Sequence, residues 1–216
     1  ELGRLHLEQT FPEEVETIYY TNATKENIND FIEKAIAEEC NIVFTTTPTF
    51  AKASVKAAIE NPNIRILNCS VNTSHRYIRT YYTRLHEAKF LMGAIAGAMA
   101  DNDKVTYIAD YPIYGTIANI NAFALGAKMI NPRVKVYLEW NSMKDYDLME
   151  NIKNVGPSCI SGKDMLVPED ASKYFGIYHM EDGEAKRLAM PLLHWGKFYE
   201  KLIQAIMDKT WNYDEE

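Results

Sequence analysis

Hydrophobic and polar residues follow one another along this chain in two rhythms, which predict helices and strands in succession. Five apolar residues near the start recur with the 3.6-residue period of an amphipathic helix: Ile28, Phe31, Ile32, Ala35 and Ile36. Short apolar runs such as 41–45 and 64–69 are typical of buried strands. Because the two kinds of element alternate strictly, we expect an α/β fold with mostly parallel, doubly wound sheets.

The same pattern places each expected element. Strands are expected at 15–20, 41–45, 64–69, 78–83, 105–110, 134–140, 158–162 and 174–178. Helices are expected at 2–11, 22–36, 50–59, 90–100, 119–129 and 195–208. The alternation begins again after Arg84, so we expect two Rossmann-like lobes, residues 1–84 and 85–190, with an interlobe cleft. Residues 191–216 are expected to form a crossover helix that returns towards the first lobe.

The order of elements also suggests a piece of a larger fold. The helical period of Leu2, Leu5, Leu7 and Phe11 has no strand before it, and the chain stops at the expected crossover helix. We therefore expect a chain that is truncated at both ends, without its first strand and its carboxyl-terminal strands.

Composition narrows the classes of partner. The net charge of −7 argues against nucleic acid or an anionic membrane surface, because both require a basic face. The richest apolar run, 90–100, is about half as long as a bilayer span, and the charged first residues do not form a signal peptide. The 3 cysteines fit a reducing compartment slightly better than an oxidising one. Neither they nor the 5 histidines have the spacing of a metal site, and we expect no cofactor.

Polar and aromatic residues gather where expected strands end, which is where α/β folds bind ligands. In the first lobe these candidates are Thr45, Thr46 and Thr47, Phe50 in the following helix, and Asn68. In the second lobe they are Asp110, Tyr111, Tyr114, Trp140 and Asp164. An ionised Asp110 accepts hydrogen bonds from ligand hydroxyls, and the aromatic rings can stack on a flat ligand ring. The structural alternatives are helix capping for the threonines, a turn cap for Asp110 and loop packing for the tyrosines.

Catalytic motifs are absent from the sequence. It has no nucleophile elbow, no Walker A loop and no dinucleotide fingerprint. No nucleophile, base and oxyanion donor come together in the pattern. The sequence therefore indicates a binding protein and not an enzyme.

Three segments resemble the basic membrane protein family, the purine-nucleoside-receptor-like substrate-binding proteins of bacterial ABC transporters. They are 87–97, 122–132 and 195–211, and the likeness in the order of elements runs over nearly the whole chain. The resemblance implies a type I periplasmic binding fold whose lobes close on a nucleoside. It also implies a ribose-gripping lysine, which falls on Lys197, where His194 replaces the family's serine. The glycine-rich loop and the Asp-x-Asp of the family are largely missing at 161–165 and 178–180.

The resemblance implies a function, a partner and a place. The function is reversible binding of a small polar ligand, delivered to an ABC transporter permease. The place is outside the plasma membrane, attached as a lipoprotein, or the cytoplasm if the full-length protein has no signal peptide. The alternative is a ligand-sensing domain of a larger intracellular regulatory protein.

Overall fold

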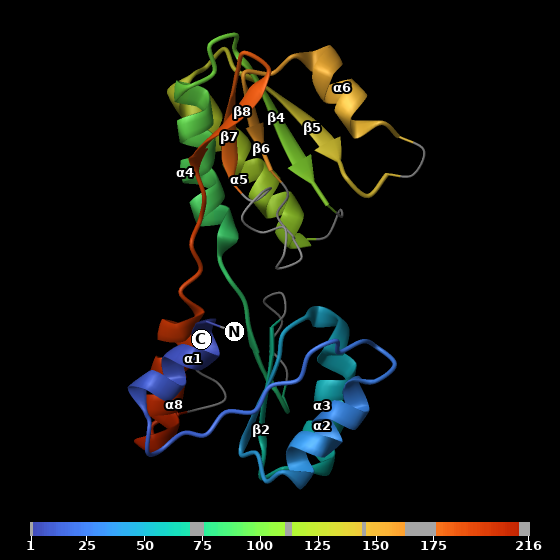
Figure 1. Ribbon diagram of the computed structural model, residues 1–216, viewed down its shortest axis with the longest axis vertical. Coiled ribbons are helices and arrows are strands. Elements are labelled where there is room, and N and C mark those ends of the chain that lie inside the picture. The colour runs from blue at the N-terminus through green and yellow to red at the C-terminus, as the bar shows by residue number, and fades with distance from the viewer. Residues whose placement is uncertain (1, 70–75, 111–113, 144–145, 163–175, 212–216) are drawn as a thin grey trace. The chain divides into compact units, whose positions relative to one another are not determined.

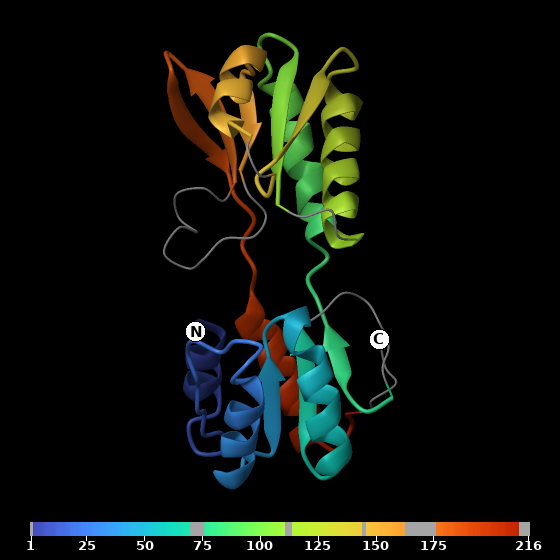
Figure 2. The ribbon, with the colours of Figure 1, turned by 90° about the vertical axis from the view of Figure 1, so that its right-hand side faces the viewer.

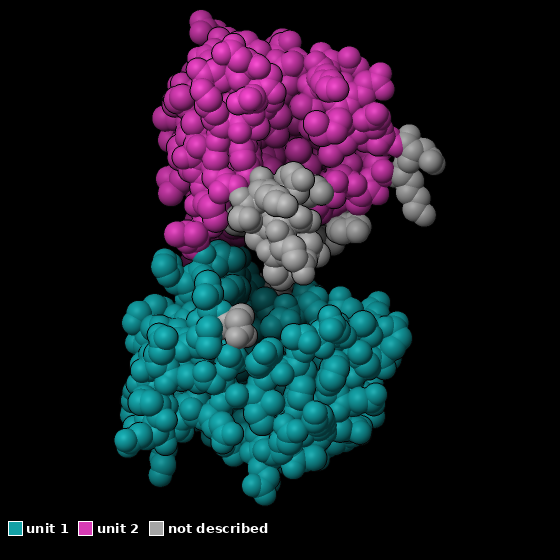
Figure 3. Space-filling view, viewed as in Figure 1, with its two compact units in different colours: residues 1–83, 193–216 teal, residues 84–192 magenta. Residues whose placement is uncertain are grey.

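The computed structural model describes residues 2–69, 76–110, 114–143, 146–162 and 176–211 (Figure 1). Contacts within the chain divide it into two units, coloured separately in Figure 3. Unit 1 is Glu1–Thr83 with Leu193–Glu216, and unit 2 is Arg84–Leu192. The chain therefore leaves unit 1 once and re-enters it near its carboxyl end.

Unit 1 is built on a parallel three-stranded sheet in the order β1-β2-β3. Its strands are β1 (Ile42–Thr45), β2 (Arg65–Cys69) and β3 (Arg79–Tyr81). Its helices are α1 (Leu2–Thr10), α2 (Ile28–Ala37), η1 (Pro48–Phe50), α3 (Ala51–Glu60) and α8 (Trp195–Met207). Figure 2 shows α2 and α3 beside the strands.

Two apolar clusters hold unit 1 together, one on each side of its sheet. On the first side, Ile28 and Ile32 of α2 pack with Ile66 and Ile78. On the second side, α1 and α8 form a layer that contains a cluster of aromatic rings. The rings are those of Phe44, Tyr81, Trp195, Phe198 and Tyr199. The expected stripe of α2 is thus confirmed as core, and the returning α8 shares a core with α1.

Unit 2 has a five-stranded mixed sheet in the order β5-β4-β6-β7-β8. Its strands are β4 (Lys104–Ala109), β5 (Lys135–Trp140), β6 (Cys159–Ser161), β7 (Ile177–Glu181) and β8 (Glu184–Ala189). Its helices are α4 (Leu85–Ala98), α5 (Tyr114–Ile130) and α6 (Leu148–Val155). The first three strands of the order are parallel, whereas β7 and β8 are antiparallel.

Helices α4 and α5 approach so closely that only glycine fits at their contact. A Cβ on Gly93 would lie 2.0 Å from the carbonyl oxygen of Phe123, and one on Gly126 would lie 2.0 Å from that of Phe90. Met92 of α4 and Phe123 of α5 then enter the same core cluster as Val105 of β4. The glycines of the family-like segments are therefore explained by backbone packing.

The structure differs from the expectations in several places. Residues 15–20 form no strand; instead Thr17 bonds to Arg4 at 2.8 Å and Tyr20 stacks on Phe31. Helix α6 and strand β8 were not predicted, and β8 has an exposed, charged pattern that resembles a loop. Helices α4 and α5 begin at Leu85 and Tyr114, each five positions before the expected start, and α2 begins at Ile28, six positions after the expected start. Strand β7 runs antiparallel to β6 and the unpredicted β8 pairs antiparallel with β7, so this edge of the sheet is antiparallel.

Candidate functional site

The carboxyl edge of the sheet in unit 1 carries a network of uncharged polar side chains. Thr45 ends β1 and pairs in register with Asn68 of β2. The Asn68 amide nitrogen donates to Thr45 Oγ1 at 2.7 Å and to the Thr47 carbonyl at 2.9 Å. Thr45 Oγ1 also lies 2.9 Å from Ser54 Oγ on α3. Three fully or nearly buried groups are thereby fixed in one orientation.

Asn68 has an unused hydrogen-bond acceptor. Its Oδ1 is buried and has no partner in the part of the chain that the structure describes. The oxygen and nitrogen of the Asn68 amide cannot be exchanged. The Thr47 carbonyl only accepts hydrogen bonds, so the Asn68 nitrogen must face it. Buried acceptors are almost always paired in folded proteins. The edge of unit 1 therefore holds a buried acceptor that has no partner among the described residues.

The other candidates of unit 1 have structural roles of different kinds. Thr47 caps η1 by accepting from the backbone N–H of Thr49 at 3.4 Å, and Thr46 is exposed. Phe50 is only 6% exposed and packs in the core cluster with Ile28. Lys197 lies in the first turn of α8, where its ammonium donates to Glu200 at 2.7 Å. Their ligand roles stay predictions.

The carboxyl edge of the sheet in unit 2 carries charge. Asp110 follows β4 and is 4% exposed. The Asn141 amide donates to Asp110 Oδ1 at 3.4 Å, and the Asn141 backbone N–H donates to Ala109 at 2.8 Å. Trp140, the last residue of β5, is half-buried against the core. The carboxylate and the indole that the sequence placed at strand ends thus do lie at the same edge, on neighbouring strands.

Lys89 is a buried cation that the sequence reasoning missed. It lies on α4 with no exposed surface, its ammonium donates to Ser161 Oγ at 3.4 Å, and it lies 5.1 Å from the Tyr107 ring centre. Burying a charge is expensive unless other groups compensate it. The signal was available, because Lys89 precedes the inward-facing Met92 and Gly93 by three and four positions.

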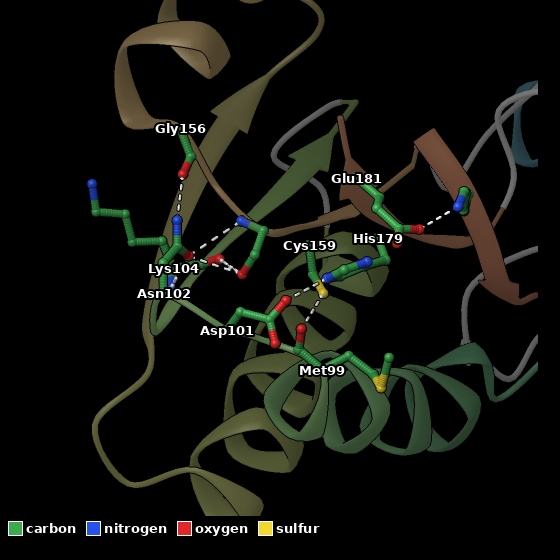
Figure 4. A network of polar contacts seen from close by, with 10 residues as sticks. Met99, Asp101, Asn102, Lys104, Gly156, Cys159, His179 and Glu181 are labelled. Carbon is green, nitrogen blue, oxygen red and sulfur yellow. Dashed lines mark hydrogen bonds and ion pairs between the residues drawn. The ribbon is translucent and has the colours of Figure 1, made fainter. Parts of the chain in front are cut away.

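The opposite, amino edge of the same sheet holds a second polar network, drawn in Figure 4. His179 Nε2 lies 2.9 Å from Asp101 Oδ2, and the Cys159 thiol donates to the Met99 carbonyl at 3.5 Å. Burial, and then the charge of Asp101, raise the pKa of the Cys159 thiol to about 12. These contacts tie β6 and β7 to the turn before β4 and leave the thiol protonated.

Two of the candidates, Tyr111 and Asp164, lie outside the described residues, as does the side chain of Tyr114. In the part of the chain that the structure covers, no three His, Cys, Asp or Glu side chains are placed to hold a metal ion. No helix in that part is long and apolar enough to cross a membrane.

One family model matches more than half of this chain. The pattern of the family described as "ABC transporter substrate-binding protein PnrA-like" (Bmp) matches residues 1–152. A purine-binding protein of Brucella abortus is 26% identical over 97% of this chain and 64% of its own length. A putative ABC transporter glucose-binding protein of Haloferax volcanii, TsgA13, is 22% identical over 90% of this chain and 54% of its own. The chain thus spans between about half and two thirds of these relatives.

A solved structure gives the same architecture. The solute-binding protein of an ABC transporter system from Conexibacter woesei superposes with a TM-score of 0.68 at 13% identity, over 97% of this chain and 76% of the other. At that identity the likeness speaks for the fold alone. The fold is the type I periplasmic binding fold, as the sequence predicted.

Proposed function

Because this chain belongs to the PnrA-like family of ABC transporter substrate-binding proteins, we propose that it reversibly binds a nucleoside-like ligand for transport. The family consists of substrate-binding proteins and not of enzymes, in agreement with the sequence, and its members are extracytoplasmic. The groups that we propose for binding are Asn68 in unit 1 and Asp110 in unit 2.

The observation that carries this proposal is the buried Oδ1 of Asn68, which has no hydrogen-bond partner among the described residues. The Asn68 nitrogen donates two hydrogen bonds, to Thr45 and to Thr47, and these bonds fix the direction of Oδ1 before a ligand arrives. Pre-orientation lowers the entropy lost on binding. Asp110, also an acceptor when ionised, requires the same kind of ligand group. A ligand rich in N–H and O–H donors suits either group.

The relatives narrow the choice of ligand. One is named for purine binding and the other for glucose binding. A purine nucleoside carries both N–H and O–H donors, which an acceptor such as Asn68 Oδ1 or the Asp110 carboxylate can accept. Trp140, half-buried at the edge of unit 2, offers a flat surface for stacking. Tyr111, Tyr114, Asp164 and Lys197 remain proposed contacts on the strength of the family resemblance.

Thermal unfolding with a ligand panel tests the proposal. A ligand that binds only the folded protein raises its stability by about 2.7 kcal/mol at a hundred times its Kd. We expect adenosine, guanosine or inosine to raise the melting temperature, and expect a smaller shift from free purine bases. A shift with glucose and none with nucleosides would favour the sugar alternative.

The permease and the membrane anchor belong to the same proposal. Delivery to a permease predicts that ligand-loaded protein binds vesicles containing the cognate permease more tightly than ligand-free protein. The alternative, a ligand-sensing domain, shares the binding step but predicts no such difference. Lipoprotein attachment is tested by metabolic labelling of the full-length protein with a fatty acid.

A further inference from the structure

A serine in the first turn of α3 connects the polar network of unit 1 to a helix. Ser54 has no exposed surface, and its hydroxyl oxygen lies 2.9 Å from the carbonyl oxygen of Phe50, four positions earlier in the chain. A serine inside a helix can bond the carbonyl four positions before it. The Ser54 hydroxyl does this and also lies 2.9 Å from Thr45 Oγ1 on β1. It therefore belongs to the sheet edge as well as to the helix.

The acceptor-only group at one end of this network fixes the direction of its hydrogen bonds. The Phe50 carbonyl only accepts, so Ser54 donates its one hydroxyl proton to it. The Ser54 oxygen then accepts from Thr45, in a contact that is shorter than the 3.3 Å between Thr45 Oγ1 and the Leu67 carbonyl. Thr45 Oγ1 in turn accepts from the Asn68 nitrogen at 2.7 Å. The protons thus point from Asn68 through Thr45 and Ser54 to the helix.

This direction leaves one atom of Asn68 for a ligand. The side-chain nitrogen is used twice, on Thr45 at 2.7 Å and on the Thr47 carbonyl at 2.9 Å. The remaining atom, Oδ1, can only accept. It is buried and has no hydrogen-bond partner among the described residues. Any ligand group that meets this atom must therefore donate a hydrogen bond.

We propose that Ser54 is a positioning residue for ligand binding. Through Thr45 it fixes the direction in which Asn68 Oδ1 accepts, and it thereby makes unit 1 select ligands that donate a hydrogen bond at that point. The inference rests on the proposed function, because it requires that Asn68 meets the ligand. It adds to that function a residue whose hydroxyl bonds only to other parts of the protein.

Removing the Ser54 hydroxyl should loosen the Asn68 amide without removing it. Hydrogen bonds in a chain strengthen one another, so the bond from Asn68 to Thr45 weakens when Thr45 loses its acceptor on α3. The Thr45 proton then turns to the Leu67 carbonyl at 3.3 Å. The Asn68 amide samples more orientations, and a ligand has to order it on binding, which lowers the affinity.

A double-mutant cycle, measured by calorimetric titration with inosine, tests the proposal. Ser54→Ala should weaken binding about threefold to tenfold, and Asn68→Ala about tenfold or more. The double variant should bind no more weakly than Asn68→Ala alone, because Ser54 acts only through Asn68. The matched control is Thr10→Val on α1, which removes another hydroxyl that bonds the carbonyl four positions back, that of His6 at 2.8 Å. This control should bind inosine as the wild type does.

Two further measurements accompany the cycle. The melting temperature of each variant shows whether it folds, and Thr45→Val replaces Asn68→Ala if that variant does not fold, with the same expectation for the double variant. The 1-methyl, 2′-deoxy, 3′-deoxy and 5′-deoxy forms of inosine each lack one hydrogen-bond donor. One of them should bind the wild type about tenfold more weakly than inosine does, and should bind Asn68→Ala as well as inosine does.

The possible results separate this inference from the proposed function. If the wild type binds inosine and Ser54→Ala binds it equally well, or if the losses in the double variant add, the positioning role of Ser54 is overturned and the proposed function stands. Analogues that weaken the wild type and Asn68→Ala equally would also overturn it. If the wild type binds glucose and no nucleoside, the nucleoside proposal fails and the same cycle is run with glucose. A wild type that binds neither overturns both.

Discussion

The carboxyl edges of the two sheets differ in one respect: one is neutral and the other is charged. At the edge of unit 1, Thr45, Ser54 and Asn68 are held by hydrogen bonds among uncharged groups. All the buried charged side chains that the structure describes, Lys89, Asp110 and Glu139, lie in unit 2. Burying a charged group costs far more free energy than burying an amide. The buried charged groups of unit 2 therefore indicate that the two sheet edges have different tasks. The edge of unit 1 thus holds a neutral acceptor in one orientation, and the edge of unit 2 holds a buried carboxyl group.

The largest expected effect comes from placing a charge in the neutral edge. Asn68→Asp keeps the shape but turns the donor that faces the Thr47 carbonyl into a carboxylate oxygen. An uncompensated buried charge destabilises by about 3–5 kcal/mol. Urea unfolding at neutral pH measures the loss, and Asn63→Asp on an exposed loop is the matched control. If both variants cost the same, the buried network has no special role.

The next effect acts on unit 2 alone. Gly93→Ala would push a methyl group against the Phe123 carbonyl and shift α4, the helix that carries Lys89. Overpacking of this kind costs about 1–3 kcal/mol. Gly115→Ala is the control, since a Cβ at Gly115 meets nothing within 4 Å, and it should stabilise by up to about 1 kcal/mol. Hydrogen exchange should locate the Gly93→Ala loss in unit 2; faster exchange in unit 1 as well would show that the units are coupled.

The alkylation rates of two cysteines allow the packing of the two sheets to be compared. Burial raises the pKa of both the Cys69 and the Cys159 thiols, and that of Cys159 reaches about 12. Since the thiolate is the reactive form, iodoacetamide at about pH 8 should alkylate half-buried Cys69 before Cys159. Peptide mass spectrometry measures both rates, and in urea the two should become equal. Faster labelling of native Cys159 would contradict the packing described for unit 2.

The smallest expected effect on stability concerns the contact between α1 and α8 in unit 1. Hydrogen bonds from Lys197 and His6 hold the pKa of Glu200 below its ordinary value of 4.5. A depressed carboxyl pKa stabilises the fold above that value, and the contribution is lost as the pH falls through the folded-state pKa. The stability gap between wild type and Glu200→Gln should therefore close below about pH 4.5. A gap that stays constant with pH would assign the loss to packing, and exposed Glu13→Gln is the control.

The fold was more predictable from sequence than the site. The sequence pattern located the parallel strands because short, mostly apolar runs such as 64–69 fit buried strands. The family-like segments 87–97 and 122–132 form the glycine contact of α4 and α5. Helix α6 was missed although Asp147 caps it by accepting from Glu150 and Gly156 ends it at φ 59°. Residues 15–20 were predicted to form a strand because polar and apolar residues alternate along them. Alternation is a property of the segment alone, whereas a strand also needs a neighbouring strand to hydrogen-bond with.

At the site, position was predictable and environment was not. The sequence placed Asn68 and Asp110 at strand ends because the carboxyl edge follows from the topology. It could not show that the Asn68 oxygen has no partner among the described residues, since the orientation of this amide depends on the Thr47 carbonyl 21 positions away. Nor could it separate Phe50, which packs in the core, from Trp140, which is half-buried at the edge.

Calorimetric titration of a purine nucleoside into wild type, Asp110→Ala and Asp103→Asn tests the central claim most directly. The two aspartates flank the same strand, Asp110 at its carboxyl end and Asp103 at its amino end, beside Arg133. A hydrogen bond to a charged group contributes about 1.5–3 kcal/mol, so Asp110→Ala should weaken binding about tenfold to a hundredfold. Asp103→Asn should bind as the wild type does. Equal affinities for all three proteins, or no heat from any nucleoside, would contradict ligand binding through the carboxyl edge.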